Sequence, residues 1–226
     1  MLKYLLPALS LSILLSASPV SAQSGYRISL FRSQPTGDFA NTGTEASGYA
    51  LPGWGGSLEH FASSPSWPEG LAFSVRISYQ SNQLDNKQLE RDTEAALPGV
   101  DVSVSKSHYR PLVLTFGPVY RWEINDTFAF RASAGVGAMV TVLDPIRISI
   151  FDTQGNLSGQ EDLFFQSLPD LTYHFGVAFC VKRFELSVNH SSAKEKTITT
   201  FGDARESEST QKIGFINFAI GFAIGN

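Results

Sequence analysis

The residues of this sequence that could act as a catalytic unit are His190 and Ser192, at the end of a run of alternating apolar residues. A serine hydroxyl becomes a usable nucleophile when a histidine takes its proton and a carboxylate orients the pair. The carboxylate could come from one of three later acidic residues, of which we take Glu206 as the candidate: Glu195, Glu206 or Glu208. On a β-strand, His190 and Ser192 would share the face of Val188. A polar strand end is the simpler interpretation.

A second set of charged residues is spaced so that its members would meet inside a barrel. By parity each of them lies on the polar face of its segment: Arg27, Glu59, Arg76, Arg121, Arg131, Lys182 and Glu185. Buried charges must pair to avoid a large desolvation cost, so we expect an Arg/Glu network that plugs the lumen. A network that only holds the barrel together is favoured over a conducting pore, because eight strands leave little free lumen.

The segment that most clearly predicts a strand is 128–141, FAFRASAGVGAMVT. Alternate positions from Phe128 to Val140 are wholly apolar, and the positions between them are small or polar apart from Arg131. Such alternation is typical of a β-strand. The segment exceeds a usual soluble strand and is long enough to cross a bilayer at a tilt, which takes about 9–11 residues.

Seven further segments follow the same rule and predict an all-β chain. The eight expected strands are Tyr26–Phe31, Tyr49–Phe61, Leu71–Gln80, Tyr109–Trp122, Phe128–Thr141, Leu171–Val181, Phe184–Asn189 and Ile213–Ile224. The connections alternate long, short, long, with the long ones polar: we expect loops at 81–107, from Asp152 to about Phe165, and at 192–211. Outer-membrane barrels have this asymmetry between short periplasmic turns and long extracellular loops. The expected fold is therefore an eight-stranded antiparallel up-and-down transmembrane β-barrel.

The composition of the two strand faces separates a membrane barrel from a soluble sandwich or a lipocalin-like barrel. The apolar faces carry aromatic residues at strand ends that would form a girdle at the membrane surface: Tyr26, Tyr79, Tyr120, Trp122, Tyr173 and Phe184. The other faces hold Gly, Ala, Ser and Thr, which suit a crowded lumen. A soluble outer surface would carry many more Lys and Glu. We therefore expect the apolar faces to look outward to lipid.

The start of the chain predicts export. Lys3, an apolar run from Leu5 to Leu15 and small residues up to Ala22 are typical of a secretory signal peptide over residues 1–22, followed by a barrel domain over 23–226. The formal net charge of −4 argues against a nucleic-acid partner. A single Cys180 and the isolated His60 and His174 predict no disulfide, no metal site and no cofactor.

On these segments the chain resembles the small eight-stranded outer-membrane barrels of Gram-negative bacteria, of the outer membrane protein A and X type. The resemblance covers nearly all of the mature chain and lies in topology and alternation. It implies a location in the bacterial outer membrane, contact with its lipid and lipopolysaccharide, and insertion by the outer-membrane assembly machinery. That machinery reads an amphipathic final strand, for which IGFINFAIGFAIGN is suited.

A weaker resemblance concerns His190-Ser191-Ser192. It is similar to the His-x-Ser motif of the lipid A deacylase family, although Ala193 stands where that family has Asn. We expect a non-enzymatic barrel with a structural or surface-interaction role, whose external loops meet an unknown partner. The alternatives are a narrow porin-like channel and a lipid A deacylase-like hydrolase.

Overall fold

Eight antiparallel strands pair in a closed ring in the computed structural model, which describes residues 24–43, 47–202 and 205–224. The expected signal peptide, residues 1–22, lies outside the described residues. The strands of the ring are β1 (Ser24–Thr36), β2 (Gly53–Ala62), β3 (Leu71–Gln83), β5 (His108–Glu123), β6 (Phe128–Leu143), β9 (Asp170–Val181), β10 (Phe184–Phe201) and β11 (Glu206–Ile224). Each strand pairs with its neighbour in this order, and β11 pairs with both β10 and β1. The predicted eight-stranded up-and-down barrel is confirmed.

The strands turn their large apolar side chains outward. Phe116, Phe130, Phe175 and Phe218 are 54%, 49%, 56% and 54% exposed, although all four lie within long regular strands. Their neighbours in sequence, such as Thr115 and Arg131, are 4% and 5% exposed. This arrangement is the reverse of a soluble barrel and gives a wall whose outer surface suits lipid.

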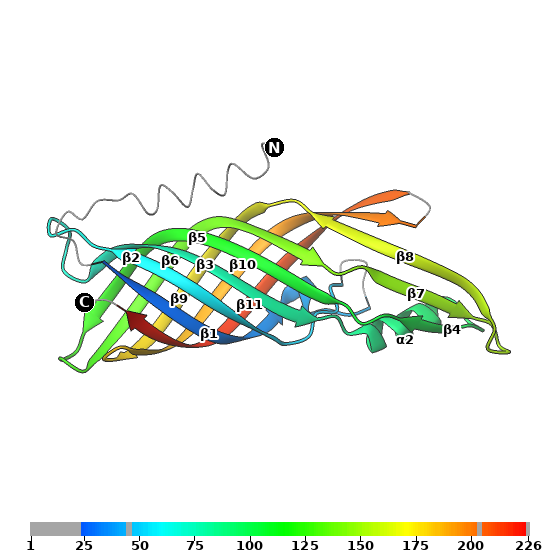
Figure 1. The fold of residues 1–226 in the computed structure, drawn as a ribbon, viewed down its shortest axis with the longest axis horizontal. Coiled ribbons are helices and arrows are strands. Elements are labelled where there is room, and N and C mark those ends of the chain that lie inside the picture. Colours follow the sequence, from blue (N-terminus) through cyan, green and yellow to red (C-terminus); the bar gives the residue numbers. More distant parts are fainter. Residues whose placement is uncertain (1–23, 44–46, 203–204, 225–226) are drawn as a thin grey trace.

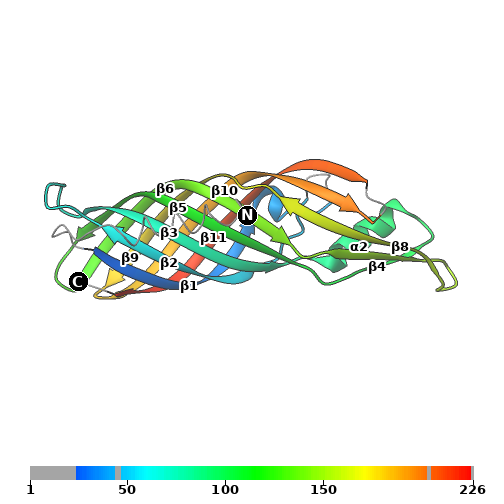
Figure 2. The ribbon, with the colours of Figure 1, turned by 45° about the horizontal axis from the view of Figure 1, so that its top comes forward.

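The two ends of the barrel differ. The connections 63–70, 124–127 and 182–183 lie at one end, which we call the hairpin end. The tightest of them has Lys182 in the left-handed region at φ 53°. The other end, which we call the extension end, carries the 3-10 helix η2 (Gly37–Phe39), helix α2 (Asn86–Ala96) and further strands, as Figures 1 and 2 show.

The sequence predicted loops at 81–107, from Asp152 to about Phe165, and at 192–211. The structure has strands or a helix in each of these segments, so the three predictions are wrong. Strands β10 and β11 continue beyond the barrel wall as one long hairpin through most of residues 192–211. Strand β8 (Leu157–Ser167) pairs with β10, β7 (Ile146–Phe151) pairs with β8, and β4 (Asp101–Val104) pairs with β7. These strands leave the wall and are not apolar on one whole face, so their alternation is weak in the sequence.

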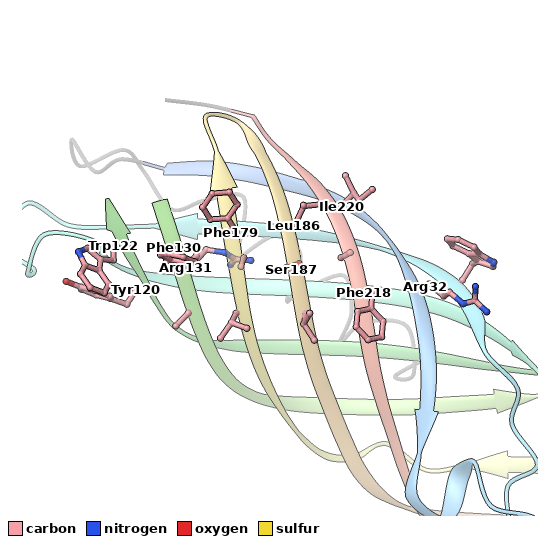
Figure 3. Close-up of a pocket in the computed structure, with 16 residues that line it drawn as sticks. Arg32, Tyr120, Trp122, Phe130, Arg131, Phe179, Leu186, Ser187, Phe218 and Ile220 are labelled. Carbon is pink, nitrogen blue, oxygen red and sulfur yellow. The ribbon is translucent and has the colours of Figure 1, made fainter. Parts of the chain in front are cut away.

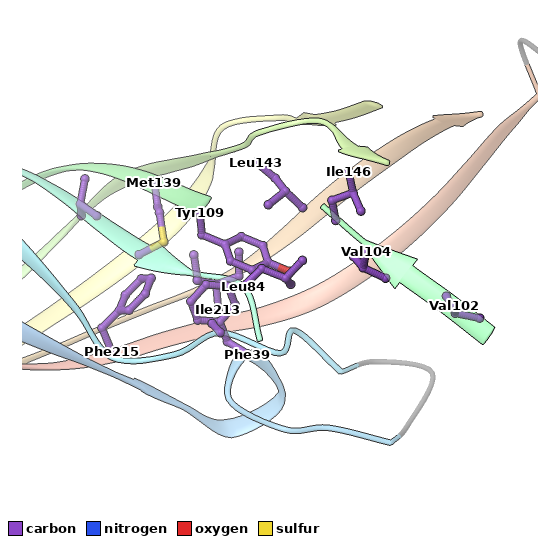
Figure 4. Packing of buried hydrophobic residues seen from close by; sticks show 13 residues of the cluster. Phe39, Leu84, Val102, Val104, Tyr109, Met139, Leu143, Ile146, Ile213 and Phe215 are labelled. Atoms are coloured by element: carbon purple, nitrogen blue, oxygen red, sulfur yellow. The ribbon is translucent and has the colours of Figure 1, made fainter. Parts of the chain in front are cut away.

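An apolar cluster closes the lumen at the extension end (Figure 4). Phe39 of η2 is fully buried and makes edge-to-face contacts with Tyr109 and Phe215, with ring centroids 4.7 and 5.1 Å apart. The Tyr109 hydroxyl donates to the carbonyl of Gly48 at 2.7 Å, which fastens the first connection over the opening. The cluster continues through Ile146 and its neighbours along the strands β8, β7 and β4, which we call the added sheet.

Helix α2 covers the outer edge of the added sheet. The backbone N–H groups of Val102 and Val104 in β4 donate to the carboxylates of Glu94 and Glu90, at 3.0 and 2.8 Å. An open strand edge is a template for pairing with another chain, and these carboxylates occupy it. Asp85 caps the helix by accepting from the N–H of Gln88. Neither α2 nor any other helix in the described part of the chain is long and apolar enough to span a membrane.

Replacing Glu90 and Glu94 together with alanine should expose this edge. We expect the amides of Val102 and Val104 to exchange hydrogen for deuterium at least about tenfold faster, since each loses a hydrogen bond worth about 1 kcal/mol or more. Mass spectrometry after exchange measures this. Arg91→Ala, an exposed change on the same helix, is the matched control. Equal exchange in the double variant and the control would contradict the capping role.

Candidate functional site: the barrel lumen

Four charged side chains form a closed ring across the lumen, within the first four strand residues from the hairpin end. Arg131 of β6 donates to both oxygens of Glu185 of β10, at 2.9 and 2.7 Å, and to both oxygens of Glu59 of β2, each at 3.1 Å. Arg27 of β1 donates to Glu59 at 2.9 Å and lies 3.0 Å from Glu185. All four residues are at most 5% exposed. The guanidinium of Arg131 thus bridges opposite walls of the barrel.

A second layer of polar side chains lies next to this ring, on its side towards the extension end. Arg76 of β3 donates to Asn189 at 3.0 Å and to Ser57 at 3.2 Å, and its Nη1 lies 3.4 Å from Nε2 of His174. The other ring nitrogen of His174 is 3.2 Å from the hydroxyl of Ser191. Because these partners come from β2, β9 and β10, the layer ties three parts of the wall together. Asn189 and His174 have the parity of the lumen face, which is the signal that could have added them to the expected network.

The structure brings together five of the seven residues expected in the network: Arg27, Glu59, Arg76, Arg131 and Glu185. Arg121 and Lys182 lie outside it. Arg121 is directly opposite Arg131 across β5 and β6, but its Nε is 3.4 Å from the carboxylate of Glu123 and not from those of the ring. Lys182 is exposed in the two-residue turn between β9 and β10, where no lumen wall surrounds it. Parity placed both on the inner face, but it could not show that Arg121 would lie against Glu123 or that β9 would end before Lys182.

The six aromatic residues expected in a girdle all lie on the outer face, with 40% to 66% of each side chain exposed. Their registers place them in two groups, towards the hairpin end (Tyr26, Tyr120, Trp122, Phe184) and towards the extension end (Tyr79, Tyr173). Figure 3 shows Tyr120 and Trp122 at one end of this wall and Arg32 at the other. The guanidinium of Arg32 lies 6.0 Å from the ring of Trp54.

The possible catalytic residues are not gathered in one place. Glu206 pairs with Thr200 near the tip of the long hairpin, while His190 pairs with Ile216 within the wall. The ten residue steps from His190 to Thr200 correspond to roughly 33 Å of strand. Ser192 is 2% exposed, although its parity predicted a side chain facing lipid, because it lies between Tyr173 and Gly214 of the adjacent strands. The His190 ring instead contacts the ring of Tyr173, with centroids 5.8 Å apart.

A hydroxyl-lined cavity of about 360 Å³ lies at the extension end of the lumen, bordered by Thr141, Ser167 and Thr197. Glu195 of β10 is fully buried beside it and accepts from the Thr141 hydroxyl at 3.0 Å. Its second oxygen has no hydrogen-bond partner among the described residues. The neighbouring Lys194 and Lys196 are exposed on the outer face, so the strand has left the apolar band here. Burial raises the pKa of Glu195 to about 7.

Among residues 24–43, 47–202 and 205–224, no group of three or more His, Cys, Asp or Glu side chains is placed to hold a metal ion. Cys180 is buried, and its thiol lies 3.6 Å from the carboxylate of Glu185.

Arg131→Gln should destabilise the barrel strongly, because Glu59 and Glu185 each lose two hydrogen bonds while remaining buried. Removing one partner of a buried ion pair costs about 3–5 kcal/mol. Arg110→Gln is the matched control, since it removes an exposed ion pair with Asp144 that is worth at most about 1 kcal/mol. The free energy of unfolding by urea in lipid vesicles measures both. If Arg131→Gln costs no more than the control, the ring does not stabilise the barrel.

Glu195→Gln should remove a pH dependence of stability. A carboxyl whose pKa is raised from 4.5 to about 7 in the folded state stabilises fully below pH 4.5, and this contribution is lost as the pH rises to about 7. We expect wild type to lose up to about 3 kcal/mol between pH 4 and 8 relative to the variant. Unfolding midpoints at both pH values measure this, with the exposed Glu208→Gln as control. Parallel pH profiles for wild type and Glu195→Gln would contradict the assignment.

Comparison with known proteins adds similar folds at low sequence identity. No protein-family model matches the chain, and no curated protein matches it. The structure of Ail from Yersinia pestis in complex with the heparin analogue sucrose octasulfate is 13% identical, covering 90% of this chain and 99% of Ail, with a TM-score of 0.41. OprG from Pseudomonas aeruginosa is 10% identical over 91% of this chain and 95% of its own, with a TM-score of 0.43. Neisserial surface protein A is 10% identical over 91% and 99%, with a TM-score of 0.39. The eight-stranded barrel architecture is established by the strand pairing of this chain itself.

Proposed function

We propose that the chain is an integral barrel of the bacterial outer membrane with a structural or surface-interaction role. In this proposal residues 1–22 are a secretory signal peptide, the assembly machinery inserts the barrel, and outer-membrane lipid and lipopolysaccharide surround its wall. The observation that carries the proposal is the inverted wall, with large apolar side chains outside and paired charges inside. Among exported bacterial proteins this inversion is typical of outer-membrane barrels.

The extension end supports a role at the cell surface. In outer-membrane barrels the short turns face the periplasm. The hairpin end would therefore face the periplasm, and the extension end would face the outside of the cell. Strands β10 and β11 are 18 and 19 residues long, well beyond the roughly 9–11 needed to cross the bilayer. The added strands β8, β7 and β4 and helix α2 enlarge this end. We propose that this sheet is the surface that meets an extracellular partner.

The side chains inside the lumen favour a barrel that does not conduct solutes. The ring of Arg131, Glu59, Arg27 and Glu185 crosses the lumen towards the hairpin end, and the cluster around Phe39 packs at the extension end beside the cavity at Thr141. An eight-stranded lumen is only wide enough for side chains to fill. We therefore favour a barrel that presents a surface over one that conducts solutes.

The proposal predicts which connections are accessible on intact cells. An epitope inserted at residues 152–155, between β7 and β8, should bind antibody added to whole cells. The same epitope inserted at 124–127, between β5 and β6, should bind only after the outer membrane is permeabilised. Flow cytometry before and after permeabilisation measures both. Equal labelling of the two insertions on intact cells, or labelling of the second alone, would contradict the proposed location and orientation.

A further inference from the structure

A second cavity, of about 340 Å³, opens at the hairpin end of the lumen, and we call it the hairpin-end vestibule. Its inner end is lined by Arg27 and Arg131, the two arginines of the charged ring. Its sides include Arg121 of β5 and the Lys182-Arg183 turn, together with the connection that ends at Gly70. The cavity therefore lies beneath the network, on the side away from the added sheet.

The vestibule is strongly cationic. Five cations line it against one carboxylate: Arg27, Arg121, Arg131, Lys182 and Arg183 against Glu123. The charged network above does not balance this excess, because Arg27, Arg76 and Arg131 face only Glu59 and Glu185. Taken together, six cations face three carboxylates at this end of the lumen. A narrow cavity lined by one sign of charge concentrates ions of the opposite sign.

Two of these arginines have donors without acceptors. Nε of Arg27 and Nε of Arg121 are buried and make no hydrogen bond within the described residues. Each lies near a carboxylate, at 3.0 Å from Glu185 and 3.4 Å from Glu123, but without the alignment for a hydrogen bond. Arg27 is only 5% exposed. A buried donor without an acceptor costs about 1–3 kcal/mol, and more where it is charged, so this site is incomplete as it stands.

The strand register adds a direct repulsion. Arg121 and Arg131 are opposite each other across β5 and β6, with both side chains on the lumen face. Like charges in directly opposite positions destabilise a sheet. Arg131 is occupied by Glu59 and Glu185, whereas Arg121 has, in the part of the chain that the structure describes, the exposed Glu123 alone as an ion-pair partner. An anion held between the two guanidinium groups would relieve the repulsion and accept the free hydrogen bonds.

We propose that the hairpin-end vestibule is a binding site for a phosphate group. A guanidinium presents paired donors that match phosphate oxygens, and a phosphate carries enough charge to offset the excess of cations. The phosphate could be a free anion or the headgroup of a phospholipid at the barrel mouth. The inference rests on the fold and the described side chains, and it does not depend on the proposed role at the cell surface.

The test uses the purified full-length mature barrel in dodecyl maltoside, which contains no phosphate. Inorganic phosphate is titrated at constant ionic strength in sodium chloride, and binding is followed by isothermal calorimetry and by amide NMR shifts. We expect saturable binding to wild type, with shifts at Gly70, Arg121 and Lys182. Arg121→Gln should weaken binding at least tenfold, while Arg110→Gln at the opposite end should bind as wild type does. Glu123→Gln should bind several-fold more tightly, since it removes the one carboxylate that the described residues contribute to the cavity wall.

Several results would overturn the proposal: no saturable binding by wild type, equal binding by Arg121→Gln and Arg110→Gln, or no gain from Glu123→Gln. Arg121 is partly exposed, so its replacement should leave the barrel folded, and resistance to boiling on a gel checks this. A competition experiment then distinguishes the two possible sources of the phosphate group. Displacement of bound phosphate by a short-chain phosphatidylglycerol supports a headgroup ligand, and failure to displace it supports the free anion; both results require the site to exist.

Discussion

The need to satisfy every backbone hydrogen bond without water constrains the whole structure. In a hydrocarbon environment an unpaired N–H or C=O costs several kcal/mol, so a sheet can cross it only as a closed ring. Here the pairing of β11 with both β10 and β1 closes the ring and leaves no free edge in the wall. Closure sets the narrow lumen, and the narrow lumen determines which side chains can lie inside.

The interior follows from that limit. Arginines reach across the lumen to carboxylates on the opposite wall, where Arg131 pairs with both Glu59 and Glu185 and so limits the cost of removing these charges from water. Small residues make room for them: a Cβ on Gly176 would lie 2.3 Å from the side-chain oxygen of Asn189, in the layer above the ring. At the extension end the first connection closes the lumen with the apolar side chain of Phe39, and at the hairpin end the lumen opens into a cationic cavity. One barrel thus carries a paired core between two chemically different ends.

The sequence predicts this wall well because lipid and lumen impose alternation on every residue between them. Parity alone places Phe116 and Phe218 outside, and it selects Arg27, Arg76 and Arg131 for the interior. Parity does not predict which carboxylate a cation reaches or where a strand ends, which is why Arg121 and Lys182 were expected in a network that they do not join. Beyond the wall both faces of the sheet meet water or η2 and α2, and the alternation no longer separates strand from loop. The contacts between α2 and β4, and the cover over Ser192, depend on tertiary packing that no local pattern encodes.

The central claim is that the apolar face of every strand of the ring meets acyl chains while the charged face is shielded from them. Solid-state NMR of the protein in bilayers tests it directly, through magnetisation transfer from lipid acyl protons to protein side chains. The account predicts transfer to Phe116, Phe175, Val177 and Phe218, and only weak, relayed transfer to Arg27, Arg76 and Thr115. Strong transfer to the arginine layer, or none to the four outward side chains, would contradict it.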